Sequence, residues 1–287
     1  MKIVSVLLFG IICVQHQTSA ASFGGHEGFF GIGRNTFDTR VIGGSNAERH
    51  QFPYMVALHN QGRHTCGASV VSPTWVVTAA HCCDKNMGLN CATTQVVAGQ
   101  LHQFENHLDV QKASVAKVVI HPQYYYNGTF IDHDITLLKL ASKLVFSVAV
   151  QPVKLPSANQ VFTQGWLSGW GVYQRPPTLP VTLQYLKMDV ITNNECDEIL
   201  KHFEPYEQLP LIDSMVCAMP PSKGPETGCN GDSGGPLADD GVLIGVTSWA
   251  VNCGTYKENA PTVFTVVNKY LDFINAHVDD LPLRDGN

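Results

Sequence analysis

Short apolar segments rich in β-branched residues recur along this chain, and glycine, proline, asparagine and aspartate separate them. Segments of this length are typical of strands that turn back on one another, so the pattern predicts an all-β barrel or sandwich. Residues 268–278 are the exception, because their apolar positions follow a helical period. The strand-like segments are residues 54–59, 68–71, 75–80, 95–98, 114–120, 135–140, 165–169, 182–190 and 242–250.

The first 20 residues have the composition of a secretory signal peptide. Lys2 gives a positive start, residues 3–14 are apolar, and residues 18–20 are small, as a cleavage site requires. A buried N-terminal strand or helix is the alternative. No later stretch reaches about 18 consecutive apolar residues, so we expect a secreted, extracellular protein that does not span a membrane.

Cysteine usage agrees with an oxidising compartment. The chain has nine cysteines, and removal of Cys13 with the signal peptide leaves an even number, which indicates disulfides. Paired metal-ligand spacings do not occur, so we expect no metal and no cofactor. The net charge of −6 and the absence of a basic run argue against nucleic-acid and membrane-surface partners. The tripeptide Asn127-Gly128-Thr129 is a candidate glycosylation site.

Three segments contain residues suited to nucleophilic catalysis, in the order His, Asp, Ser. His81 follows an apolar segment, Asp134 leads another, and Ser233 lies in the sequence GDSGGP. A serine hydroxyl is a weak nucleophile, so a histidine must accept its proton and return it to the leaving group. A carboxylate must hold the imidazole in the correct tautomer.

Together with Arg40-Val41-Ile42-Gly43-Gly44, these motifs resemble the trypsin-like serine endopeptidases. The resemblance implies two packed six-stranded antiparallel Greek-key β-barrels, a cleft between them and a C-terminal helix. The protease domain would span residues 41–278, with barrels at about 41–150 and 151–265, followed by a loose polar tail at 279–287. By this resemblance Ser233 is the nucleophile, His81 the general base and acid, and Asp134 the orienting acid. The backbone N–H groups of Gly231 and Ser233 would stabilise the oxyanion.

Other titratable residues compete for these roles. Asp132 and His133 precede Asp134, but only Asp134 directly leads the apolar segment, so we expect the other two to be solvated loop residues. His121 precedes a proline and is typical of a turn.

The same resemblance implies an activation step. Cleavage after Arg40 would release the propeptide, residues 21–40, and give Val41 a free ammonium group that pairs with Asp232. An unpaired buried carboxylate is costly, so this pairing can order the active site. We therefore expect a zymogen whose activator is a trypsin-like protease.

The resemblance also locates the pocket for the substrate's P1 side chain. Trypsin-like members carry an aspartate where Thr227 stands, so a basic P1 residue would have no partner. Ala250 and Thr262 replace the glycines of large pockets, and this predicts an elastase-like preference for small or medium aliphatic residues. The alternative is a chymotrypsin-like preference for aromatic residues or leucine. The predicted pocket residues are Thr227, Gly228, Ser248, Trp249, Ala250 and Thr262.

Disulfides follow from the resemblance as Cys66–Cys82, Cys196–Cys217 and Cys229–Cys253, which leaves Cys83–Cys91. The family's calcium loop has an acid after its glycine, whereas Gln100 follows Gly99 here, and residues 101–107 supply only Glu105. We therefore expect no calcium dependence.

The resulting hypothesis is a monomeric, secreted serine endopeptidase of the elastase-like type. Its expected partners are protein or peptide substrates, the activating protease and protein protease inhibitors. A second hypothesis is a non-catalytic homologue that acts as a binding protein; the presence of Ser233, His81 and Asp134 together argues against it.

Overall fold

The computed structural model describes most of the chain from residue 44 onward, and these residues belong to one compact unit, Thr39–Asn287. The predicted signal peptide and propeptide lie outside the described residues. Within the described ranges, no helix is both long and apolar enough to cross a membrane. The described residues are 44–87, 89–171, 181–204, 206–221, 232–251 and 260–282.

The first barrel is a closed antiparallel sheet with the strand order β2-β3-β4-β9-β6-β5. Its central strands β4 and β9 are almost continuously apolar, and Val76 pairs with Leu138 in their register. Such continuous runs are typical of strands that are covered on both faces. The six strands are β2 (Met55–Asn60), β3 (Arg63–Val70), β4 (Trp75–Thr78), β5 (Gln95–Ala98), β6 (Gln111–Ile120) and β9 (Thr136–Leu140).

The second barrel has the order β11-β10-β13-β14-β15-β12, and pairing of β12 with β11 closes it. The short strand β1 (Ser45–Asn46) adds to β11, so a segment that precedes the first barrel belongs to the sheet of the second. The prediction of two six-stranded antiparallel barrels is confirmed. The strands are β10 (Gln164–Gly169), β11 (Gln184–Ile191), β12 (Met215–Met219), β13 (Pro236–Asp239), β14 (Val242–Ala250) and β15 (Thr262–Val266).

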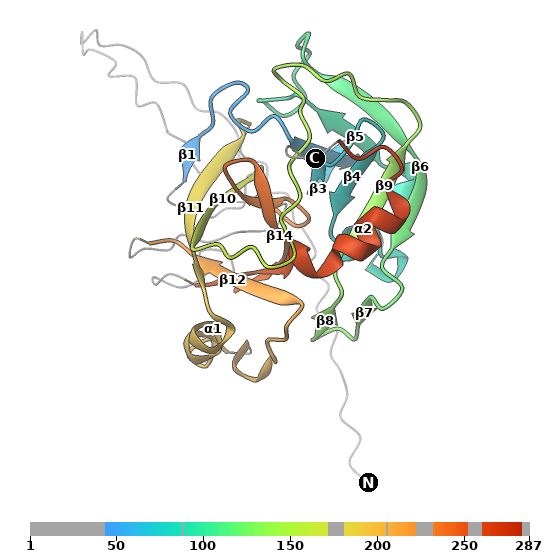
Figure 1. The fold of residues 1–287 in the computed structure, drawn as a ribbon. Helices are drawn as coiled ribbons and strands as arrows, with labels where there is room; N and C mark the ends of the chain where they lie inside the picture. Colours follow the sequence, from blue (N-terminus) through green and yellow to red (C-terminus); the bar gives the residue numbers. More distant parts are fainter. Residues whose placement is uncertain are drawn as a thin grey trace, which may run out of the picture. The chain divides into compact units, whose positions relative to one another are not determined.

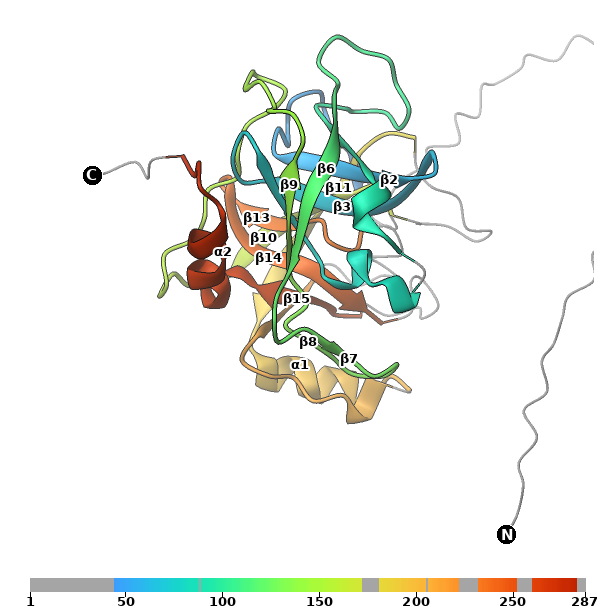
Figure 2. The ribbon, with the colours of Figure 1, turned by 90° about the vertical axis from the view of Figure 1, so that its right-hand side faces the viewer.

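Among the described residues, a two-stranded hairpin and two helices lie outside the barrels. The hairpin β7 (Tyr125–Tyr126) and β8 (Ile131–Asp132) lies toward the same end of the unit as helix α1 (Asn193–Leu200) in both views (Figures 1 and 2). The predicted C-terminal helix is present as α2 (Leu271–His277), and a 3-10 turn precedes it at Val267–Tyr270.

The predicted loose tail is partly wrong, because its first two residues are anchored. Trp75 Nε1 donates to Asp279 Oδ1 at 2.9 Å, and Thr74 Oγ1 donates to Asp280 Oδ2 at 2.8 Å. These bonds attach the end of α2 to the first barrel. Polar residues that follow a helix need not be loose when a neighbouring strand supplies donors for them.

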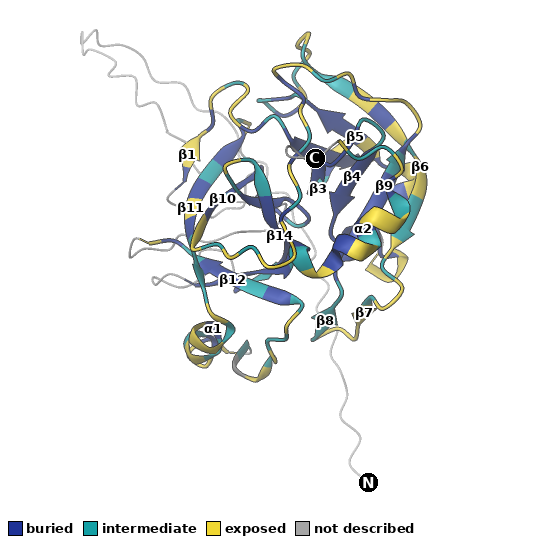
Figure 3. Cartoon of the chain, viewed as in Figure 1, coloured by how far each residue is buried: buried dark blue, intermediate teal, exposed yellow. Residues whose placement is uncertain are grey.

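Buried residues are concentrated on the barrel strands, whereas α1 and the hairpin carry exposed residues (Figure 3). One core cluster contains Val76 and Leu138 of the first barrel together with Ala238 and Val246 of the second. The backbone N–H of Gly67 in β3 also donates to the carbonyl of Ser233 at 2.8 Å. The barrels therefore pack against each other next to the residue predicted to be the nucleophile.

Candidate active site

His81 and Asp134 form a buried pair at the ends of two adjoining segments of the first barrel. His81 begins a 3-10 turn that two alanines separate from the end of β4, and Asp134 precedes β9, the strand that pairs with β4. His81 Nδ1 lies 2.7 Å from Asp134 Oδ2, and the His81 backbone N–H donates to Asp134 Oδ1 at 2.8 Å. Each carboxylate oxygen therefore contacts His81, which fixes the imidazole ring.

The second barrel completes the environment of Asp134. Ser248 Oγ donates to Asp134 Oδ2 at 2.6 Å, and Thr265 Oγ1 donates to the Asp134 carbonyl at 2.9 Å. From the sequence, we predicted that Ser248 lines the P1 pocket, and we predicted no role for Thr265. Neither bond could be predicted from the sequence, since the two hydroxyls come from strands more than a hundred residues further along the chain.

The charge of Asp134 controls the protonation of His81. Burial by itself lowers the pKa of His81, because a charged imidazolium loses its hydration. The negative charge of Asp134 and its hydrogen bond more than offset this effect, so the pKa of His81 lies above its ordinary value. The pair thus favours an imidazolium, the form that a general base adopts once it has accepted a proton.

Ser233 occupies a tight turn that holds its backbone against the first barrel. The Gly235 N–H donates to the Asp232 carbonyl at 2.8 Å, so residues 232–235 form a β-turn. Gly234 has a φ of +76°, and a Cβ there would collide with Thr78 and Gly67. Glycine is therefore required at this position by both conformation and space.

His81 and Ser233 line one cleft, which has a volume of about 440 Å³. Several lining residues were not predicted to belong to the site, and most of them come from the β7–β8 hairpin and from the loop after α1. For Met87, Tyr126, Ile131, Tyr206 and Leu209 the sequence signal was an apolar or aromatic side chain. The described lining residues are His81, Met87, Tyr126, Gly128, Thr129, Ile131, Tyr206, Leu209, Ser233, Thr247, Ser248, Trp249 and Ala250.

Of the predicted pocket residues, Ser248, Trp249 and Ala250 line this cleft at the end of β14. Thr262 is fully buried and is the register partner of Ala250 on β15, so the two side chains share a face of the sheet. Thr262 is not among the described lining residues. The predicted pocket base, Thr227 and Gly228, lies outside the described residues.

Asp232 lies directly before Ser233 and is 2 % exposed. The Gly171 N–H donates to its Oδ1 at 2.9 Å. Neither Gly169 nor Gly171 could carry a side chain, because a Cβ would overlap the Asp232 carboxylate. The other residues of the predicted switch and oxyanion site, Arg40, Val41 and Gly231, lie outside the described residues.

Three of the four expected disulfides are present: Cys66–Cys82, Cys83–Cys91 and Cys196–Cys217. The fourth, Cys229–Cys253, falls outside the described residues. Two cysteine sulfurs and the imidazole of His81 lie close enough together to resemble a metal-ligand group. The sulfurs are those of Cys66 and Cys82, which are bonded to each other and cannot act as thiolate ligands.

The neighbours of Asp134 are more ordered than predicted. Asp132 Oδ1 accepts hydrogen bonds from the His133 N–H and from Ser214 Oγ. The His133 ring stacks on His121 with centroids 4.8 Å apart, and Tyr270 Oη lies 3.0 Å from its Nδ1. The expectation of solvated loop residues was therefore wrong: Asp132 and His133 are half-buried and support the hairpin and α2.

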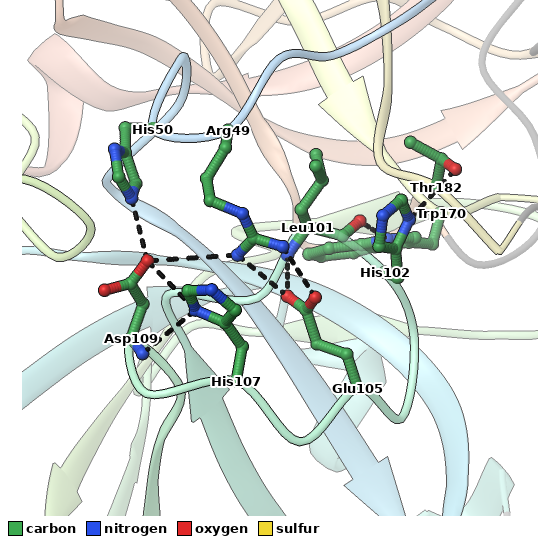
Figure 4. Close-up of polar contacts among 9 residues, drawn as sticks. All are labelled: Arg49, His50, Leu101, His102, Glu105, His107, Asp109, Trp170 and Thr182. Carbon is green, nitrogen blue, oxygen red and sulfur yellow. Dashed lines mark hydrogen bonds and ion pairs between the residues drawn. The ribbon is translucent and has the colours of Figure 1, made fainter.

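The acidic residues of the loop after Gly99 bind a cation from another segment, Arg49, which follows β1 (Figure 4). Arg49 Nη2 donates to Glu105 Oε2 at 2.7 Å, and its Nη1 lies 3.9 Å from Asp109 Oδ2. His50 Nε2 and His107 Nδ1 lie 2.8 Å and 3.2 Å from the same Asp109 oxygen. A guanidinium thus neutralises the acidic groups of this loop, although independence from calcium stays a prediction.

Comparison with known proteins places these features in a family. The sequence model of the family described as Trypsin matches residues 41–274. Trypsin-1 of Astacus astacus is 32% identical over 246 residues, which cover 83% of this chain and 99% of that protein. Chymotrypsin-like elastase family member 1 of Felis catus is also 32% identical, over 249 residues that cover 83% of this chain and 89% of the relative.

Longer relatives match as well. Ovochymase-2 of Mus musculus is 30% identical over 299 residues, covering 95% of this chain, but the chain spans only 48% of that protein. The equal identities to a trypsin and to an elastase-family protein leave the P1 preference undecided. The two barrels, the paired His81 and Asp134, and the match across residues 41–274 agree, and the chain therefore belongs to the trypsin family of serine proteases.

Proposed function

We propose that this protein is a secreted serine endopeptidase that is synthesised as a zymogen and cleaves after small or medium aliphatic residues. The observation that carries the proposal is the His81 imidazole, held by buried Asp134 on the wall of a cleft that Ser233 also lines. A histidine oriented by a carboxylate beside a serine suits acyl transfer.

The first half of the reaction is acylation. Ser233 Oγ attacks the peptide carbonyl carbon while His81 Nε2 accepts the hydroxyl proton. His81 Nδ1–H remains bonded to Asp134 Oδ2, so the new positive charge forms next to a carboxylate that three donors hold in place. His81 then gives the proton to the leaving amine, and the C–N bond breaks.

The second half is hydrolysis of the acyl-enzyme. Water loses a proton to His81 Nε2 and attacks the ester carbonyl; the bond between the acyl carbon and Ser233 Oγ then breaks, Oγ takes the proton from His81, and the acid product leaves. In both halves we assign the developing oxyanion to the N–H groups of Gly231 and Ser233, which typically contribute about 3 kcal/mol each to lowering the barrier. The β-turn at residues 232–235 supports this assignment by fixing the backbone of Ser233.

The zymogen part of the proposal rests on Asp232. Its carboxylate is buried against two glycines and accepts a hydrogen bond from the Gly171 N–H. We assign to this buried carboxylate the ammonium group that forms at Val41 after cleavage at Arg40, because a buried ion pair can order the loop that carries Ser233. Secretion is supported by the signal-like residues 1–20 and by the three disulfides.

The aliphatic P1 preference rests on the pairing of Ala250 with Thr262, which puts two side chains where large pockets have glycines. One observation favours the alternative, a preference for aromatic residues or leucine at P1. Thr262 is fully buried, and the described lining of the cleft includes Ala250 without it. A threonine that packs behind the wall would narrow the pocket less than one that projects into it.

The proposal is tested with protein that trypsin has activated and that is then freed of trypsin. We expect kcat/KM on peptides that differ only at P1 to follow the order Ala or Leu above Phe, with Arg the poorest substrate. A missing methylene changes the discrimination by only about 1–3 kcal/mol, so neighbouring aliphatic residues should differ modestly.

The variant Ser233→Ala serves as the matched control for contaminating protease. Preference for Arg would overturn the pocket assignment, and preference for Phe would support the aromatic alternative. No cleavage of any peptide by activated wild-type protein would favour the non-catalytic binding homologue.

A further inference from the structure

The β7–β8 hairpin brings the candidate glycosylation site to the edge of the active-site cleft. Tyr126 pairs with Ile131, so residues 127–130 form the turn. Two of these turn residues, Gly128 and Thr129, line the same cleft as Ser233. Figures 1 and 2 show the hairpin outside the barrels, with no further element beyond its tip among the described residues.

The side chain of Asn127 is arranged so that its amide nitrogen is available. Asn127 is exposed, and its Oδ1 accepts hydrogen bonds from the Thr129 N–H at 3.0 Å and the Phe130 N–H at 2.8 Å. These bonds form an Asx turn that occupies the oxygen. Nδ2, the atom that would carry a sugar, makes no hydrogen bond to a described residue.

The hairpin has a fixed orientation relative to the cleft. Phe130 packs against the core cluster that contains Leu200, Met215 and Val263, and this contact holds the turn against the second barrel. A substituent on Asn127 would therefore start from a defined point at the cleft edge, and would not be carried on a freely moving loop.

We propose that Asn127 carries an N-linked oligosaccharide which restricts the cleft to peptides and flexible chains and slows the approach of folded proteins. The inference rests on the proposed secreted protease function. In the modification, Asn127 Nδ2 bonds to the anomeric carbon of a lipid-linked oligosaccharyl diphosphate. The bond from that carbon to the diphosphate oxygen breaks, and the amide proton leaves to a base.

A glycan at this position acts sterically and takes no part in the reaction. It is bulky and hydrated, and it starts from the hairpin turn whose Gly128 and Thr129 line the cleft. A peptide needs only the cleft, whereas a folded substrate or inhibitor must also dock on the rim. Steric exclusion should therefore reduce the association rate of large partners and leave bond cleavage unchanged.

The experiment compares variants that are secreted from eukaryotic cells and activated in the same way. Asn127→Asp removes the sugar acceptor and retains an oxygen for the turn, and Asn127→Gln is a second acceptor-free variant. In the matched control, Asn127→Asp is combined with Val161→Thr, which completes a new acceptor sequence at Asn159. Val161 is 85% exposed and lines a separate hollow on the second barrel, so this control moves the glycan away from the active site.

We expect wild-type protein and the relocated variant, but not Asn127→Asp, to lose mass when an N-glycan-releasing amidase is added. All of them should cleave a short peptide with the same kcat/KM. Asn127→Asp and the relocated variant should cleave a folded protein substrate about ten-fold faster than wild type.

Each other outcome contradicts the inference in a recognisable way. A wild-type protein without a mass loss shows that Asn127 is unmodified. Equal rates on the folded substrate, with normal peptide cleavage, overturn the restriction and leave the protease function intact. Peptide cleavage by no variant overturns the protease function, and the inference falls with it.

Discussion

Two histidine–carboxylate pairs in this protein have nearly the same length and opposite surroundings. His81 Nδ1 lies 2.7 Å from Asp134 Oδ2, and their side chains are 11% and 2% exposed. His50 Nε2 lies 2.8 Å from Asp109 Oδ2, with side chains 35% and 25% exposed. The distance between the atoms therefore does not distinguish the two pairs, but their burial does.

The partners of each carboxylate explain the difference. Asp134 is held by donors from both barrels, so its charge stays fixed in a site of low dielectric constant. Asp109 is surrounded by His50, His107 and Arg49 on the surface, where water and salt screen each interaction. The first pair can orient the imidazole for proton transfer, whereas the second mainly connects the segment after β1 to the loop after β5.

The largest effect should come from removing one charge of the buried pair. Asp134→Asn keeps the shape but presents an amide to His81, which favours the wrong tautomer, and we expect kcat to fall by about 10⁴-fold. The matched variant Asp109→Asn should leave kcat within experimental error of wild type. Steady-state kinetics on one peptide measures kcat of both variants. Equal losses of kcat would show that burial does not distinguish a catalytic pair from a structural one.

The pH dependence should separate the pairs next. The pKa of His81 is raised, so its pairing with Asp134 stabilises the fold below the ordinary histidine value of about 6.5 and is lost as pH rises through the folded pKa. Catalysis needs the neutral imidazole, so kcat/KM should rise with pH to a midpoint above about 6.5. A pH–rate profile with its acid midpoint below that value would contradict the assignment of His81.

The pKa of Asp109 is lowered, first by its hydrogen bond with His50. Its contribution to stability is therefore present above the ordinary aspartate value of about 3.9 and is lost as pH falls through the folded pKa. The exposed pair should weaken at acid pH, where His81 is fully protonated and inactive. The two contributions to stability are thus lost in opposite directions, that of His81 as pH rises and that of Asp109 as pH falls.

A smaller effect should follow from removing one donor to Asp134. Ser248→Ala deletes a buried hydrogen bond to a charged oxygen, and we expect the free energy of unfolding to fall by about 2 kcal/mol. Ser248→Thr keeps the hydroxyl and should restore most of the loss. The matched variant Ser214→Ala removes a bond to half-buried Asp132 and should cost less. Urea unfolding measures all three, and a larger loss at Ser214 would contradict the ranking.

The strands could be predicted because apolar runs are local in sequence, whereas the pairing of His81 with Asp134, which are 53 residues apart, followed from the resemblance. Apolar runs such as those of β4 and β9 specify strands, and the motif TAAHC places His81 at the end of one of them. The two barrels themselves came from the resemblance, since periodicity alone left a sandwich equally open.

The contacts that sequence reasoning missed are those between distant segments. Ser248 and Thr265 approach Asp134 only after the barrels pack, and residues 279–280 are anchored by donors from the distant Thr74, Trp75 and Lys139. Asp132 looked solvated because its partner Ser214 is 82 residues away. The number of donors that a polar residue finds is a property of tertiary packing, which residue type and spacing do not encode.

The smallest effect should come from the exposed cluster. Arg49→Met removes the guanidinium shared by Glu105 and Asp109 but keeps the length of the stem, and we expect the free energy of unfolding to fall by less than about 1 kcal/mol. The loss should shrink further in 1 M salt, where screening acts within about 3 Å. Thermal unfolding at two salt concentrations measures it. We expect a small loss because water screens these exposed charges. A loss of stability as large as that of Ser248→Ala, and independent of salt, would contradict this reason and would show that the cluster behaves as a buried one.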